Sequence, residues 1–144
     1  MIADRVSLRG IENLSAALSA LVGRLAAAAG LDSAQAYRLR LAAEEIAVNV
    51  ATHGYGDGDG EILIDAGLDD EWVWLRLTDR SPEFDPTEHD PDPRLTADPD
   101  VGPSGGFGLF LALSSVDRFE HEYVGGRNRN KLLIRRRAGG DGGD

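Results

Sequence analysis

Apolar residues recur at three- and four-residue steps over residues 11–25, which is the spacing of one face of a helix. The face is formed by Ile11, Leu14, Leu18, Leu21, Val22 and Leu25. Gly30 lies where such a helix would end, because glycine accepts the backbone conformation that closes helices. Residues 2–8 before this helix show a weaker pattern that is typical of a strand.

A second helix is predicted to begin directly after the first. Asp32 suits the N-cap position, and Gln35 three residues later completes a capping-box pattern. The apolar face of this helix consists of Leu39, Ala43, Ile46 and Val50. The run His53–Gly56 follows and is expected to end the helix.

The rest of the chain predicts two hairpins and one further helix. Residues 61–68 and 72–79 are expected to pair across a turn at Asp69 and Asp70, and residues 118–124 to pair with 129–136 across 125–128. The segment 82–103 reads as a long proline-rich loop. A glycine-rich stretch then leads into an apolar helix that is expected to run through Val116.

Two hairpins are incompatible with an all-parallel sheet. We therefore expect an α+β fold, a two-layer sandwich in which helices cover one face of a mostly antiparallel sheet. Residues 1–137 are expected to form a single domain, and residues 138–144, which contain only Ala, Gly and Asp, to form a disordered tail.

The charge and the residue composition exclude or disfavour several classes of function. The 144-residue chain has a net charge of −10, which disfavours nucleic acid as its main partner because phosphate would be repelled. It has no cysteine, which excludes thiolate metal sites and a cysteine nucleophile. The sequence has neither a signal-peptide pattern nor an apolar run long enough to span a membrane, so a cytoplasmic location is expected.

The first candidate for chemistry lies on the second helix. Glu45 and Asn49 are four residues apart and therefore neighbours on one helix face, whereas Glu44 points away from Asn49. A carboxylate beside an amide oxygen can hold a hard cation such as Mg²⁺, and the carboxylate can act as a general base. The alternative is a polar helix face in solvent.

The second candidate is Asp79. It follows Val73, Leu75 and Leu77 on the same face of the predicted strand, where the alternation calls for an apolar side chain. A carboxylate at the edge of a core requires hydrogen-bond donors. Either the amides of a following turn or the amino group of a ligand could supply them.

The third candidate is the glycine-rich entry to the last predicted helix, with Gly105, Gly106 and Gly108 around Phe107. Glycines let the backbone come close to a ligand, and the free amides at a helix N-terminus attract phosphate. The stretch lacks the Lys-Ser or Lys-Thr of a P-loop. Alone it is weak evidence.

The order and spacing of these motifs resemble the ATP-binding fold shared by gyrase and histidine kinases. The resemblance rests on Glu45-x-x-x-Asn49, the strand that ends in Asp79, a long loop, and a Gly-x-Gly-Leu sequence. The residues Phe84-Asp85-Pro86 and the block 106–111 look like one branch, the bacterial anti-sigma-factor serine/threonine kinases. The resemblance covers about residues 5–136.

This resemblance implies bound ATP and Mg²⁺ and assigns roles to the candidates. Glu45 matches the general base, Asn49 the Mg²⁺-holding residue, and Asp79 the aspartate that binds the adenine amino group. Ser81 stands in the first glycine box, and Gly105, Gly106, Phe107, Gly108 and Leu109 match the second, which meets the phosphates. Residues 87–104 would form the lid. The implied partners are a small STAS-like antagonist protein and a sigma factor, and a homodimer is expected.

One departure keeps a second hypothesis open. Ser81 and Glu83 stand in the first glycine box, where the family usually has Asp-x-Gly-x-Gly or Asp-x-Gly-x-Pro. A serine that must adopt a positive φ would cost about 1 kcal/mol or more. Together with the acidic loop, this substitution would weaken nucleotide binding, and the chain would then be a protein-interaction module of the same pathway type.

Overall fold

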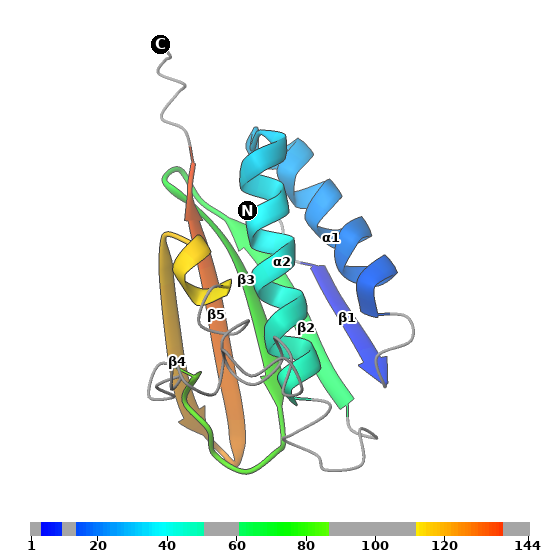
Figure 1. Ribbon diagram of the computed structural model, residues 1–144, viewed down its shortest axis with the longest axis vertical. Coiled ribbons are helices and arrows are strands. Elements are labelled where there is room, and N and C mark those ends of the chain that lie inside the picture. Colours follow the sequence, from blue (N-terminus) through cyan, green and yellow to red (C-terminus); the bar gives the residue numbers. More distant parts are fainter. Residues whose placement is uncertain (1–3, 10–13, 51–60, 87–111, 137–144) are drawn as a thin grey trace, which may run out of the picture.

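The computed structural model describes residues 4–9, 14–50, 61–86 and 112–136 of the chain. Two long helices come early in this fold, and four of its five strands follow them (Figure 1). The elements in chain order are β1 (Asp4–Arg9), α1 (Leu14–Ala29), α2 (Ser33–Asn49), β2 (Glu61–Leu68), β3 (Trp72–Asp79), β4 (Arg118–Val124) and β5 (Arg127–Arg135).

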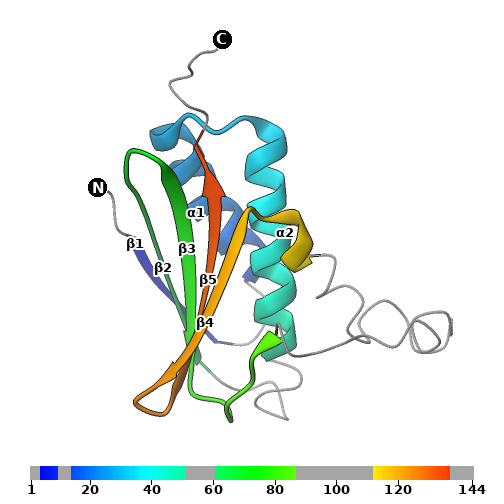
Figure 2. The same ribbon diagram turned by 90° about the vertical axis from the view of Figure 1, so that its left-hand side faces the viewer.

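The strands form one sheet in the order β1-β2-β3-β5-β4, and all four neighbouring pairs are antiparallel. Both long helices lie on the same side of this sheet (Figure 2). The predicted two-layer α+β sandwich is therefore confirmed. The described strands contain no parallel pair, so the sheet is purely antiparallel in this part of the chain.

Local sequence signals fix the ends of the helices. The Asp32 side chain accepts a hydrogen bond from the backbone N–H of Gln35 at 2.7 Å, and the Gln35 side chain accepts one from the backbone N–H of Asp32 at 3.0 Å. This is the predicted capping box, and it satisfies two backbone donors at the start of α2. Gly30 has a φ of 76°, which allows the chain to leave α1 and enter α2.

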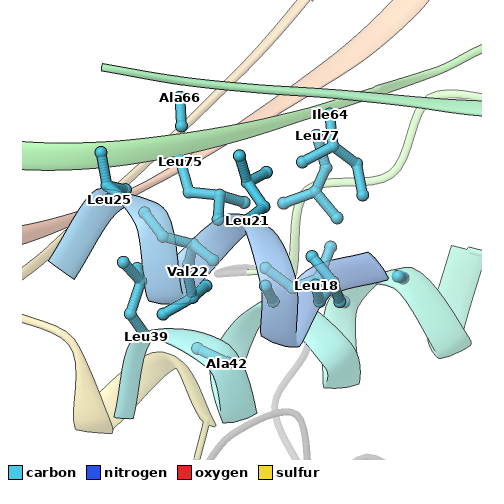
Figure 3. Packing of buried hydrophobic residues seen from close by; sticks show 14 of the residues in the cluster. Leu18, Leu21, Val22, Leu25, Leu39, Ala42, Ile64, Ala66, Leu75 and Leu77 are labelled. Carbon is cyan, nitrogen blue, oxygen red and sulfur yellow. The ribbon is translucent and has the colours of Figure 1, made fainter. Parts of the chain in front are cut away.

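The core lies between the two layers. Side chains from α1 and α2 pack against those of β2 and β3, as the labelled residues in Figure 3 show. The largest side chains with almost no exposure are Leu18, Leu21, Leu39, Ile46, Ile64, Leu75, Leu77, Leu132 and Ile134. The apolar faces predicted for both helices are thus buried, apart from Ile11, which lies outside the described residues.

The two hairpins differ in how well their turns were predicted. The hairpin of β2 and β3 has the predicted strand bounds, and its turn at Asp69 is fastened by a bond from the Asp69 N–H to the Trp72 carbonyl at 2.9 Å. The prediction of a four-residue connection between β4 and β5 was wrong. Gly125 and Gly126, with φ of 61° and 77°, make a two-residue turn, so β5 begins at Arg127.

Two further boundaries differ from the prediction, and two predicted segments lie outside the described residues. The first strand covers residues 4–9 instead of 2–8, and the helical turn at residues 112–115 ends one residue before Val116. The predicted tail 138–144 and the run His53–Gly56 lie outside the described residues. No helix in the described part of the chain is long and apolar enough to cross a membrane.

Candidate functional site

The inner face of the sheet changes from apolar to polar along its strands. On β3 the buried residues Val73, Leu75 and Leu77 are followed by Asp79, which is 2% exposed. On the neighbouring strand β5 the buried positions run from Asn128 and Asn130 to Leu132 and Ile134. The register pairs Asp79 with Asn128 and Leu77 with Asn130, so the three polar residues gather at one end of the core.

Asp79 lies at the centre of this polar end. Its Oδ1 atom accepts hydrogen bonds from the backbone N–H of Ser81 at 2.9 Å, from the Ser81 hydroxyl, and from Asn128 Nδ2 at 3.1 Å. Its Oδ2 atom is buried and has no hydrogen-bond partner in the described part of the chain. The turn after β3 therefore satisfies one carboxylate oxygen and leaves the other free, which fits a donor group brought by a ligand.

Asn128 connects Asp79 to the segment that follows β3. Its Nδ2 group approaches the carbonyl oxygens of Ser81 and Pro82 at 3.0 and 3.1 Å as well as Asp79. Its Oδ1 atom accepts a hydrogen bond from the backbone N–H of Phe84 at 2.9 Å. One buried amide thus holds residues 81–84 against the end of β3. Figure 2 shows this segment turning toward the side of the sheet on which α2 lies.

A histidine extends the same network. His121 on β4 has a side chain that is only 6% exposed, and its Nε2 atom lies 3.1 Å from Asn128 Oδ1. Because that oxygen can only accept, Nε2 carries the proton and donates. The Nδ1 atom lies 3.8 Å from Asp85 Oδ2. The order Asp85, His121, Asn128, Asp79 therefore forms a continuous polar path across three segments.

Ser81 does not carry the backbone strain considered from the sequence. No non-glycine residue in the described part of the chain has a positive φ, so Ser81 occupies an ordinary conformation. Its side chain is inside, at 4% exposure, and donates to Asp79. The condition for that cost, a positive φ at this position, is therefore not met.

Glu45 and Asn49 are both half-buried on the last two turns of α2. Neither side chain forms a hydrogen bond or ion pair with another described residue. Glu44 is engaged instead, because it accepts from Ser15 Oγ at 3.0 Å and pairs with Arg40 at 2.7 Å. The two adjacent glutamates therefore differ. Glu44 is held by Ser15 of α1 and by Arg40 of its own helix, whereas Glu45 has no such bond to a described residue.

The end of α2 and the end of β3 lie at the same edge of the molecule (Figures 1 and 2). This arrangement brings the last turns of α2, which contain Glu45 and Asn49, to the edge at which β3 ends in Asp79. Gly105, Gly106, Phe107, Gly108 and Leu109, and the predicted lid 87–104, lie outside the described residues. The described residues contain no group of three His, Asp or Glu side chains that could hold a metal by themselves.

Asn128, Asn130 and His121 were not predicted as site residues. The signal for the two asparagines was present, because they alternate with Leu132 and Ile134 just as Asp79 alternates with apolar residues. Asn128 was missed because residues 125–128 are predicted to form the turn, whereas Asn130 lies within the predicted strand 129–136 and its polar side chain was not recognised there. His121 required the pairing of β4 with β5, which places it opposite Asn130 and which sequence alone does not give.

Comparisons with known proteins agree with this geometry. A family model described as "Histidine kinase-like ATPase domain" matches residues 10–136. The chain is also similar to a solved structure of the RsbU and RsbW domains of Rv1364c from Mycobacterium tuberculosis, with a TM-score of 0.64 and 20% identity. That likeness covers 94% of this chain and 33% of the other, so the chain spans about a third of its length. No curated protein matches the chain significantly.

Proposed function

Because the chain belongs to the family of histidine kinase-like ATPase domains, we propose that it is a Mg-ATP-dependent serine/threonine protein kinase that acts as an anti-sigma regulatory factor. Its substrate in this proposal is a small STAS-like antagonist protein. The motif resemblance over residues 5–136 and the structural likeness to a chain that includes an RsbW domain support this branch of the family.

The single observation that carries the proposal is the buried Oδ2 atom of Asp79, which has no hydrogen-bond partner among the described residues. A buried carboxylate oxygen without a donor is costly, and natural proteins leave such groups unpaired at sites that complete themselves with a ligand. The adenine amino group is a donor of the required kind. The Ser81 and Asn128 bonds fix the other oxygen, so the carboxylate is oriented before any ligand arrives.

The roles proposed on α2 follow from side chains that lack partners in the described part of the chain. The amide oxygen of Asn49 would hold Mg²⁺, and the Glu45 carboxylate would take the proton from the hydroxyl of the protein substrate. Bound Mg²⁺ would neutralise charge on the phosphates. Gly105, Gly106, Phe107, Gly108 and Leu109 are proposed to supply backbone contacts to those phosphates, and residues 87–104 to cover them.

A second candidate is a protein-interaction module that has weak nucleotide binding. The observation that favours it is the acidic character of the segment from Glu83 onward, an unfavourable charge sign beside a triphosphate. The strain at Ser81 that had also motivated it is absent. Both candidates predict a homodimer in a partner-switching pathway with a sigma factor, and both place the protein in the cytoplasm.

Calorimetric titration with ATP, with and without Mg²⁺, tests the nucleotide site. We expect Mg²⁺-dependent binding that Asn49→Ala weakens, and binding that Asp79→Asn weakens whether or not Mg²⁺ is present. Glu44→Ala is the matched control for Glu45→Ala, because the two glutamates are adjacent and only Glu44 is tied to Ser15 and Arg40. Neither glutamate variant should change ATP affinity strongly.

Phosphate transfer separates the two candidates. With a STAS-like antagonist protein as acceptor, Glu45→Ala should abolish serine or threonine phosphorylation while Glu44→Ala retains it. Equal transfer by the Glu45→Ala variant would remove Glu45 from the mechanism. Absence of ATP binding at millimolar concentration, together with ATP-independent partner binding, would favour the interaction module.

A further inference from the structure

Asn130 is a second buried acceptor that the fold leaves unsatisfied. Its side chain is 2% exposed, and its Oδ1 atom has no hydrogen-bond partner in the described part of the chain. Asn128, two residues away on β5 and equally buried, has both of its polar atoms engaged. An uncompensated amide in a core costs free energy, so a structural role explains Asn128 and does not explain Asn130.

The register places Asn130 beside Asp79 on the inner face of the sheet. Asn130 pairs with Leu77 and Asp79 pairs with Asn128, so Asn130 and Asp79 are diagonal neighbours on the inner face. Diagonal Cα atoms in an antiparallel pair are about 7–8 Å apart, within reach of side chains of this length. Two acceptors that share one amino group, each with an N–H···O distance of about 2.9 Å, stand about 5 Å apart.

We infer that Asn130 is a specificity-determining residue that, with Asp79, reads the exocyclic amino group of the bound nucleobase. Such a group has two protons, and the two buried oxygens without partners provide one acceptor for each. A 6-oxo purine would place an acceptor against both oxygens and be rejected. This inference rests on the proposed function, because it requires that the polar end of the sheet binds a nucleotide base.

The test compares two ligands that differ only at the amino group, Mg-ATP and the Mg²⁺ complex of purine riboside triphosphate, which has hydrogen at position 6. Their dissociation constants are measured by calorimetry for the wild type and for Asn130→Leu. One hydrogen bond is worth about a 3- to 10-fold change in affinity. We expect Asn130→Leu to weaken ATP binding by this factor and to leave binding of the analogue unchanged.

The control variant is Thr78→Val, a polar-to-apolar change on the opposite face of β3, one residue from Asp79. It should leave both affinities as in the wild type. Melting of the nucleotide-free proteins provides a readout that is independent of binding. Because Asn130→Leu removes an unsatisfied group from the core, its melting temperature should equal or exceed that of the wild type. Asn130→Val, which also lacks the acceptor, replaces it if the leucine variant does not fold.

The outcomes distinguish recognition of the amino group by Asn130 from a purely structural role of this residue. A loss confined to ATP supports amino-group reading by Asn130. An equal loss for ATP and the analogue, or no loss for either, overturns the inference and leaves the proposed function standing. Absence of any nucleotide binding by the wild type overturns the proposed function itself, and this inference with it.

Discussion

Replacing Asn128 by alanine tests whether the polar end of the sheet is held together by this one side chain. The Asn128 amide makes six contacts within hydrogen-bond distance, to Asp79, to the carbonyl and hydroxyl oxygens of Ser81, to Pro82, to Phe84 and to His121. Truncation removes all of them, including those that join residues 81–84 to β5.

The expected loss can be estimated from the number of protons involved. The two Nδ2 protons and the two donors to Oδ1 correspond to four hydrogen bonds of about 1 kcal/mol each. Asp79 keeps both bonds from Ser81, and water can reach the Phe84 N–H in the variant, so the net loss is smaller. We expect the free energy of unfolding to fall by about 3 kcal/mol, a large share of the 5–15 kcal/mol typical of a domain.

The assay is equilibrium unfolding in urea, with Asn130→Ala as the matched control. Both variants delete the same atoms from residues that are 2% exposed on one strand, so their cavity terms are similar. Among the described residues the Oδ1 atom of Asn130 has no hydrogen-bond partner to lose, so truncation of this side chain should change stability by less than about 1 kcal/mol. The difference between the two variants isolates the Asn128 hydrogen bonds.

Equal losses for the two variants would refute this reasoning. That result would mean that the network around Asn128 is no more stabilising than a cavity of the same size. A change in the urea dependence itself would indicate an altered denatured state and disqualify the comparison.

Three further variants or titrations test separate parts of the fold. Ser81→Gly should destabilise the protein by about 1–2 kcal/mol in the same urea assay, because it removes the hydroxyl bond to Asp79 and adds backbone freedom, whereas a gain in stability would point to strain at Ser81. Leu75→Ala, at a fully buried position in the central strand, should cost about 2–5 kcal/mol, and a loss below 1 kcal/mol would contradict the core assignment. The Asp69 side chain accepts hydrogen bonds from the backbone N–H groups of Trp72 and Glu71, and these bonds lower the pKa of Asp69 from 3.8. The contribution of Asp69 to stability is therefore present above pH 3.8 and is lost as the pH falls through the lowered pKa. An NMR titration midpoint at or above 3.8 would contradict this.

Periodicity was enough to predict most of the fold because the two long helices and the strands β2, β3 and β5 each bury one face. The capping box at Asp32 and the hairpin of residues 61–79 lie where the sequence places them, since local hydrogen bonds and alternation act over a few residues. The prediction of the β4–β5 turn was wrong for a local reason as well. Two consecutive glycines at positive φ make the short turn whose twist matches the strands, so the strand begins two residues earlier than expected.

The site was predictable only where a single residue breaks a pattern. Asp79 is recognisable because it ends an apolar alternation, and its Oδ2 atom has no hydrogen-bond partner among the described residues. The bonds of Asn128 to residues 81–84 join positions more than 40 apart, and their existence depends on the pairing of β3 with β5. The spacing of residues along the chain does not predict which strands pair, because strand order is a property of the folded sheet.

The polar end of the sheet contains both hydrogen-bonded and unsatisfied polar atoms. Asn128 and Oδ1 of Asp79 are saturated by bonds from the chain itself, which makes their positions rigid. Oδ2 of Asp79 and Oδ1 of Asn130 have no such bonds within the described residues. Folding this end without a ligand therefore leaves two acceptors uncompensated, and a rigid frame is needed to keep them from reorienting toward protein donors. Preorganised, unsatisfied acceptors are what selective recognition of an amino group requires, because the ligand then gains its hydrogen bonds without a further ordering cost.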